Sequence, residues 1–266
     1  MRVTPADNPY QEPRSGRLAA WGNSLLAGFS PPDHVVEEVV GTDELHRVTG
    51  LPGDAPGDLH GLSWALGRLR VLGATGLRLA LPVEGHPLGL TGPAAFNHAA
   101  LAAGEAVVAV GLPVGLVPQV DVHGPPGDQS TTVLWRCLEV QDGPPADVPS
   151  LHEAERELAE GLYEATALLT RLDVAGAGPD ALRELDRFRR RGHRELLAPG
   201  YPPRAVRVLE SARQVAALLA IAAGGHGAAV SASEMAARTA ALAPLRRTTR
   251  RAQVAAYNAL VDERRD

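Results

Sequence analysis

One group of polar residues in the first half of the sequence has the side chains that acid–base or metal chemistry needs. Asp121 and His123 are two residues apart, so on a strand both side chains would face the same side of the sheet. Carboxylate and imidazole together suit a zinc site or general acid–base catalysis, because histidine titrates near neutral pH and aspartate can orient it or share a metal. The Gly- and Pro-rich loop 83–93 could reach the end of that strand. The candidate catalytic residues are therefore Glu84, His86, Asn97, Asp121 and His123, with His98 beside them, and the metal candidates are His86, Asp121 and His123.

A simpler interpretation of the same residues stays open. They could solvate the edge of a sheet, with Asn97 and Asp121 capping backbone groups. The sequence has no P-loop, no HExxH and no GxGxxG after an expected strand. The segment 61–65 is similar to a nucleophile elbow at Ser63 but lacks the final glycine, so we expect Ser63 to be a helix N-cap instead.

The composition is that of a globular protein with an acidic balance. Hydrophobic residues make up 45% of the 266 residues, aromatic residues only 4%, and the formal net charge is -5. This balance argues against a general binder of nucleic acid or of anionic membranes. All 26 residues counted as Lys or Arg are arginines, which is typical of a GC-rich bacterial genome and removes Schiff-base and P-loop chemistry.

Cysteine content and hydrophobic patterning predict a cytoplasmic protein. Cys137 is the only cysteine, so neither an intramolecular disulfide nor a cysteine-based zinc site can form. Residues 1–13 lack the apolar core of a signal peptide and are expected to form a flexible arm. The longest apolar run, 215–225, is too short against the roughly 20 residues that span a bilayer. We therefore expect no membrane partner, and no motif predicts a cofactor.

Residues 14–147 predict an α+β domain with a small mixed or antiparallel sheet. Apolar residues recur at helical spacing over 62–72, where Gly73 can end a helix, and Leu77, Leu79 and Leu81 alternate as in a half-buried strand. The segments 106–110 and 114–122 predict a hairpin, although the first could instead continue the preceding helix, and 131–140 predicts the strand that pairs with 114–122. The other expected elements are helices at 18–26, 32–40 (with a strand possible) and 93–103, and a short edge strand at 46–51.

Residues 148–266 predict an all-helical bundle domain. The segment 142–149, DGPPADVP, is a composition break typical of a domain boundary. Ser150 and Glu153 have capping-box spacing at the start of a helix with heptad-like apolar positions. Further helices are expected from Pro179, from the pair 202–203 to the double glycine 224–225, and after a second capping box at 231–234, with Pro244 dividing or kinking the last.

The leading functional hypothesis is a non-enzymatic interaction or scaffold protein that assembles through its helical half, as a homodimer or with a protein partner. The helix over 215–223 is apolar almost all round, so it should be buried at the centre of the bundle or against another subunit. The predicted interaction residues are Val215, Leu218, Leu219, Arg246, Arg247, Arg250 and Arg251.

Two alternatives come from other functional classes. The first is a small-molecule-binding protein, or a metal or acid–base enzyme, with its site at the polar residues around the loop 83–93. The second is nucleic-acid binding through the arginine clusters 187–194 and 246–251. Pairing of these arginines with the Glu-rich helix 153–164 is favoured over nucleic-acid binding, because aromatic residues are nearly absent among them.

Overall fold

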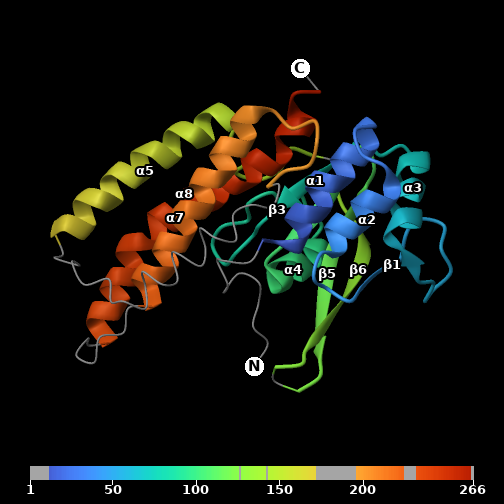
Figure 1. Cartoon of the computed structure of the whole chain (residues 1–266), viewed down its shortest axis with the longest axis horizontal. Coiled ribbons are helices and arrows are strands. Elements are labelled where there is room, and N and C mark those ends of the chain that lie inside the picture. Colours follow the sequence, from blue (N-terminus) through green and yellow to red (C-terminus); the bar gives the residue numbers. More distant parts are fainter. Residues whose placement is uncertain (1–11, 126, 142, 172–195, 225–231, 265–266) are drawn as a thin grey trace.

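The computed structural model describes residues 12–264, apart from 126, 142, 172–195 and 225–231. The described residues form a mixed fold of helices and one six-stranded sheet (Figure 1), which confirms the predicted α+β class. The helices are α1 (Arg14–Ala27), α2 (Pro32–Val40), α3 (Leu62–Leu72), α4 (Ala94–Ala103), α5 (Leu151–Arg171), α7 (Pro203–Gly224) and α8 (Ala232–Asp262). The strands are β1 (Leu45–Thr49), β2 (His60–Gly61), β3 (Gly76–Ala80), β4 (Ala106–Val110), β5 (Val114–His123) and β6 (Ser130–Glu139).

The sheet has the order β2-β1-β6-β5-β4-β3, and only β1 and β6 run parallel. The predicted hairpin of 106–110 with 114–122, and the pairing of the latter with 131–140, are confirmed. The expected edge strand at 46–51 is β1, but the short β2 pairs on its outer side. Because β4 begins only at Ala106, the end of β5 extends past it and pairs with β6 alone, as a projecting hairpin (Figure 1).

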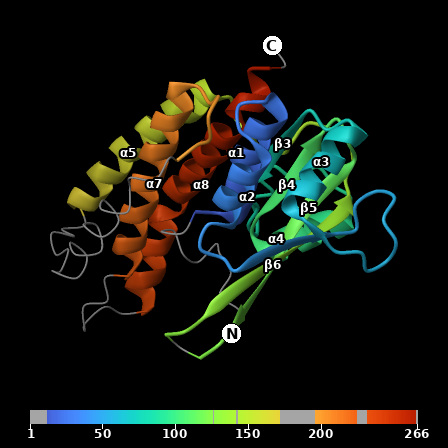
Figure 2. The same cartoon turned by 45° about the vertical axis from the view of Figure 1, so that its right-hand side comes forward.

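Apolar residues cover both faces of the sheet. Consecutive side chains of a strand point to opposite faces, and on β4 Val107 and Ala109 belong to the main core while Ala106 belongs to a second cluster. That second cluster is built around Phe96 of α4, and the main core includes Leu18 of α1. Helices therefore pack on each face. In Figure 2, α1 lies between α8 and the sheet, with α2 beside it.

Most of the helix ends and caps that the sequence predicted are found in the structure. The segment 32–40 is helical, which decides between the two expectations for it. Gly73 ends α3 in the left-handed conformation, with φ 108°, as predicted. Ser63 is not the N-cap of α3, because the helix begins one residue earlier and Gly61 occupies that position without a side-chain cap. The capping box is confirmed, since the Glu153 backbone N–H donates to Ser150 Oγ at 3.2 Å and the Ser150 N–H donates to Glu153 Oε2 at 2.9 Å.

Two buried asparagines close the outer edge of β3. Asn23 of α1 accepts from the Leu77 N–H at 2.6 Å and donates to the Leu77 carbonyl at 2.8 Å. Asn258 of α8 does the same for Leu79, at 2.7 Å and 3.3 Å. Each side-chain amide offers one donor and one acceptor, as a neighbouring strand would, so the edge is covered by helices instead of being left open.

A buried ion network ties α1 to β1 and β6. The Asp43 carboxylate accepts from Arg14 Nε and Nη2 at 2.8 and 2.7 Å and from Arg17 Nη2 at 3.0 Å. His46 Nε2 lies 3.0 Å from the same carboxylate, while Trp135 Nε1 donates to His46 Nδ1 at 3.2 Å. Burial lowers the pKa of His46, which fits a neutral ring that donates through Nε2 to Asp43 and accepts at Nδ1.

In the described part of the C-terminal half, α5, α7 and α8 pack side by side (Figure 1), and α8 continues to β3 and α1. Among the predicted interaction residues of α7, Val215 and Leu219 are buried by this chain itself, whereas Leu218 is 46% exposed. No helix in the described residues is long and apolar enough to cross a membrane. Outside the described residues lie most of the expected arm (1–11), the expected helix from Pro179, the arginine cluster 187–194 and Ser231.

Candidate functional site

The predicted site residues lie in different parts of the fold. Asp121 and His123 are exposed on the projecting hairpin, where their register partners are Thr132 and Ser130. His123 Nε2 lies 3.3 Å from Thr132 Oγ1. In the contacts of the described residues, neither is joined to the loop 83–93.

Of the two candidate residues in that loop, Glu84 and His86, only His86 is buried. Glu84 is exposed, and His98 is exposed on α4. Asn97 accepts from the Gly92 N–H at 3.0 Å, which is the backbone-capping role considered as the simpler interpretation. The predicted residues therefore do not converge on one site, and His86 is the one whose surroundings we describe further.

His86 is paired with an aspartate that the sequence analysis did not single out. His86 Nε2 lies 2.7 Å from Asp147 Oδ2, and the ring is 4% exposed. Asp147 belongs to the segment 142–149 and, in the part of the chain that the structure describes, is the non-glycine residue with a positive φ, 56°. Aspartate tolerates this conformation better than most residues. This contact joins the turn of Val83 and His86 to the start of the C-terminal half.

Arginines of α8 complete the cluster. Arg247 Nη2 donates to Asp147 Oδ2 at 2.8 Å. Arg251 Nη1 donates to both the backbone carbonyl and the carboxylate of Asp147. Arg251 also donates to Glu157 of α5, through Nε at 2.9 Å and Nη2 at 3.1 Å. This pair confirms the expected pairing with the Glu-rich helix for Arg251.

Arg250 is the unusual member of the cluster. Its Nη2 lies 3.5 Å from His86 Nδ1, at the limit of a hydrogen bond, and its Nε is buried without a hydrogen-bond partner in the described structure. Among the described residues, no carboxylate is paired with Arg250 or with Arg246. Burial lowers the pKa of Arg250, and the neighbouring charges of Arg247 and Arg246 lower it further.

The pKa shifts agree with this geometry. Burial lowers the pKa of His86, and the cations Arg247 and Arg250 lower it further against the opposing effect of Asp147. Burial alone would raise the pKa of Asp147, but hydrogen bonds from Arg247, Arg251 and His86 lower it to about 2. At neutral pH His86 is therefore a neutral ring that donates through Nε2 to an ionised carboxylate, with Nδ1 left as an acceptor toward Arg250.

This state of His86 gives a pH dependence with a definite sign. In the unfolded chain histidine binds a proton near pH 6.5, whereas folded His86 binds it only at lower pH. The free energy of unfolding should therefore fall as the pH is lowered from 7.5 through about 6.5 toward 5. Urea unfolding at several pH values should show a smaller slope for His86→Gln than for the unchanged chain. An equal slope in the two proteins would refute the assignment of a low pKa to His86.

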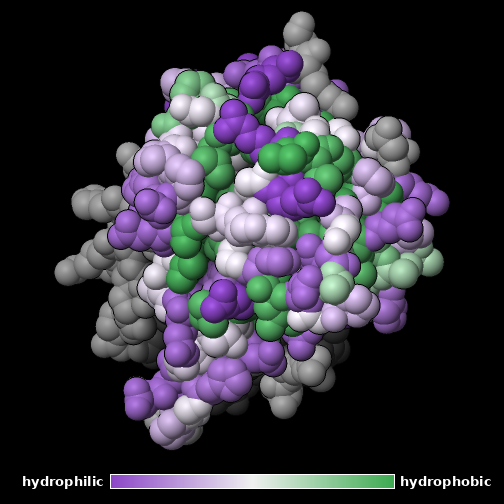
Figure 3. Space-filling view, turned by 90° about the vertical axis from the view of Figure 1, so that its right-hand side faces the viewer, coloured by the Kyte–Doolittle hydropathy of each residue, from purple (hydrophilic) through white to green (hydrophobic). Residues whose placement is uncertain are grey.

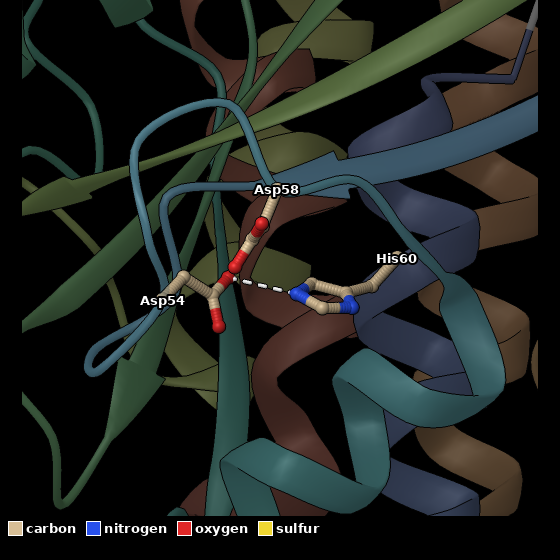
Figure 4. A group of neighbouring side chains, drawn as sticks. All are labelled: Asp54, Asp58 and His60. Carbon is tan, nitrogen blue, oxygen red and sulfur yellow. Dashed lines mark hydrogen bonds and ion pairs between the residues drawn. The ribbon is translucent and has the colours of Figure 1, made fainter.

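A second group of side chains, which could bind a metal ion, lies near β2, at the edge of the sheet opposite β3. One ligand atom from each of Asp54, Asp58 and His60 lies within 4.8 Å of the others, and His60 Nε2 is 3.0 Å from Asp54 Oδ2 (Figure 4). The sequence analysis missed this group. Its pattern, Asp-x-x-x-Asp-x-His, was visible in the turn-rich stretch before α3, but no standard metal motif has that spacing.

Comparisons with known proteins find relatives in mycobacteria. Residues 15–149 match the model of the N-terminal domain of Rv1486c-like proteins, and residues 152–254 match that of their C-terminal domain. A protein of Mycobacterium tuberculosis, MT1533, is 32% identical over 240 residues, which is 78% of this chain and 82% of that protein. ML1804 of Mycobacterium leprae is 28% identical over 287 aligned positions, covering 92% of this chain and 96% of that protein. No solved structure matches the chain.

Proposed function

The chain belongs to the Rv1486c-like protein family, and we propose that it binds a small anion, such as a phosphate or a carboxylate, at Arg246 and Arg250 beside His86. The observation that carries this proposal is the buried Nε of Arg250, which has no hydrogen-bond partner in the described structure. Buried donors in proteins are nearly always paired. Arg17 Nε also lacks a partner, but Arg17 donates to Asp43, whereas no carboxylate among the described residues is paired with Arg250. An anion held at Arg250 would supply the missing partner.

The charges around this position favour the same ligand. Arg247 and Arg251 are compensated by Asp147 and Glu157, while Arg246 and Arg250 have no described carboxylate partner. Arg246 and Arg250 are four residues apart on one helix, and like charges at that spacing destabilise a helix by about 0.2–0.5 kcal/mol. An anion between them would reverse this repulsion, and the planar guanidinium fork suits phosphate and carboxylate oxygens.

We assign His86 a positioning role. Its Nε2 is used by Asp147, and its Nδ1 faces Arg250, so it has no free donor for an anion. The neutral ring fills the space beside Arg250 without adding a positive charge that the site does not need. Of the candidate residues predicted from the sequence, this proposal therefore keeps only His86. The proposed anion site does not include Glu84, Asn97, Asp121 or His123.

Titration calorimetry with inorganic phosphate at constant ionic strength tests the proposal. The unchanged chain should bind phosphate, and Arg250→Gln should weaken binding by about tenfold or more, because a hydrogen bond to a charged group contributes roughly 1.5–3 kcal/mol. Arg70→Gln, at an exposed arginine of α3, is the matched control and should leave binding unchanged. Equal weakening by the two substitutions would mean that phosphate responds only to overall charge.

A second candidate function is assembly with a protein partner or a second copy through the helical half. It is favoured by apolar side chains that this chain leaves exposed: Leu162 and Tyr163 of α5, at 42% and 80%, and Leu218 of α7. Light scattering after size exclusion should then give a dimer mass for the unchanged chain and a monomer mass for Tyr163→Ser with Leu218→Ser. A monomer in both cases would remove assembly with a second copy. Nucleic-acid binding has less support, because Arg247 and Arg251 are used within the chain.

Two further expectations accompany these candidates. Residues 148–266 are proposed to form an all-helical bundle domain, supported by the three long helices α5, α7 and α8 described there. A cytoplasmic location is proposed from the single cysteine, Cys137. Burial raises the pKa of this partly buried thiol to about 12, so it is unreactive at neutral pH.

A further inference from the structure

We propose that Asp54, Asp58 and His60 form a binding site for one divalent transition-metal ion of the Zn²⁺ type, separate from the anion site. One ligand atom from each residue lies within 4.8 Å of the other two (Figure 4). Zinc binds imidazole nitrogen and carboxylate oxygen at about 2.0–2.2 Å, so two ligands of one ion are normally about 3–3.5 Å apart. The 3.0 Å between His60 Nε2 and Asp54 Oδ2 is already of that size.

The three side chains are held in place before any ion binds. The Leu51 N–H donates to Asp54 Oδ2 at 3.2 Å, and the Ala55 N–H donates to Asp58 Oδ2 at 2.9 Å. The His60 ring stacks on the Trp64 ring with centroids 3.7 Å apart and planes 16° apart. Because each ligand has a fixed orientation, little conformational entropy remains to be lost on binding.

The carboxylates of Asp54 and Asp58 would be stabilised by a nearby positive charge. The Asp54 side chain is only 7% exposed, and the second carboxylate, Asp58, lies within the same few ångströms. Two neighbouring carboxylates repel each other, and a buried one is costly unless a cation or several donors compensate it. Among the described residues, His60 is the group that faces Asp54 as an ion-pair partner, so the two carboxylates have a single side chain that could carry an opposite charge.

The donor set and the surroundings select the class of ion. Imidazole suits Zn²⁺, Ni²⁺, Cu²⁺ and Fe²⁺, whereas Mg²⁺ and Ca²⁺ prefer oxygen ligands alone. Three protein ligands leave at least one position for water or a ligand molecule. The site is accessible, since Asp58 is exposed and His60 is partly exposed. On the face of the molecule drawn in Figure 3, hydrophilic residues lie among hydrophobic ones. A Lewis-acid centre open to solvent is therefore the chemistry that this group would provide.

Titration calorimetry with ZnCl₂ on the chelator-treated full chain tests the site. The unchanged chain should bind one Zn²⁺, and His60→Gln and Asp58→Asn should each weaken that binding by about tenfold or more, since even loss of an outer-shell partner costs 10–100-fold. MgCl₂ should give no comparable heat. Circular dichroism of both variants checks that they are folded.

The chain supplies a matched control for adventitious binding to a histidine next to a tryptophan. His34 is exposed and lies against Trp21 with ring centroids 5.0 Å apart, but it belongs to no described ligand group. Ni²⁺ should quench the fluorescence of Trp64, so the quenching should disappear in Trp64→Phe and His60→Gln and persist in His34→Gln. Equal Zn²⁺ affinity in His60→Gln and His34→Gln, or quenching that survives Trp64→Phe unchanged, would overturn the proposal.

Discussion

Replacing Asp43 by asparagine should lower the free energy of unfolding by about 3–5 kcal/mol, the usual cost of removing one partner of a buried ion pair. The Asp43 carboxylate is buried and faces Arg14, Arg17 and His46. Asparagine keeps the shape of the side chain but removes its charge, so two buried guanidinium groups would lose their counter-charge. Urea unfolding followed by circular dichroism measures the change.

The control for this prediction is Asp128→Asn, at an exposed position between β5 and β6, which should change stability by no more than about 0.5 kcal/mol. Combining Asp43→Asn with Arg14→Gln should cost less than the sum of the two single changes, because the second removes a charge that the first leaves unpaired. Strict additivity, or an effect of Asp43→Asn as small as that of the control, would mean that the network does not contribute as described.

The same carboxylate predicts loss of stability in acid. Although burial opposes ionisation, hydrogen bonds from His46 and Arg14 and the charges of both arginines hold the pKa of Asp43 well below its usual range. The unfolded chain therefore takes up a proton near pH 3.9 while the folded chain does not. The stabilisation is present above that pH and falls as the pH decreases toward the folded pKa.

Replacing Asn258 by alanine should lower the free energy of unfolding by about 2–4 kcal/mol, because two buried backbone groups would lose their partners and each unsatisfied group costs roughly 1–3 kcal/mol. Asn258 is fully buried and serves both the N–H and the carbonyl of Leu79 on the edge strand β3. The Leu79 amide should also exchange with deuterium faster than in the unchanged chain.

Asn97→Ala is the matched control for this second prediction. Asn97 is only half-buried, and its side chain accepts a single hydrogen bond, from the Gly92 N–H. Its replacement should cost clearly less than that of Asn258. If the two substitutions cost the same, or if Leu79 stays fully protected from exchange, the asparagine does not close the sheet edge.

Local signals in the sequence predicted most of the helices and strands. They could not predict contacts between residues that are far apart in the sequence. Gly73 ends its helix and Ser150 pairs with Glu153 because these signals act within one turn of the chain. Asn258 lies 179 residues from Leu79, and Arg251 lies 104 residues from Asp147. No periodicity connects residues so far apart, so neither the closed edge nor the contacts of the arginines with Asp147 could be predicted.

The candidate site was misplaced for a physical reason of the same kind. The spacing of Asp121 and His123 correctly places both on one strand, but whether a strand end faces a cavity depends on its neighbours. The short β4 leaves that end of β5 in a projecting hairpin, and the side chains are exposed. His86 was identified because it is an imidazole in a Gly- and Pro-rich loop that was expected to reach the end of that strand. Its partner Asp147 was not identified, because it lies in a Pro-rich segment that indicated only a domain boundary.

The most direct measurement of anion binding is a crystal structure of the full chain soaked in tungstate, a phosphate analogue whose heavy atom gives an anomalous signal. We predict an anomalous peak whose oxygens lie within hydrogen-bond distance of Arg250 Nε, about 2.7–2.9 Å for a charge-assisted bond, and the loss of that peak in Arg250→Gln. A structure in which tungstate binds elsewhere on the chain, while Arg250 Nε stays without a ligand at saturating concentration, would contradict the proposed function.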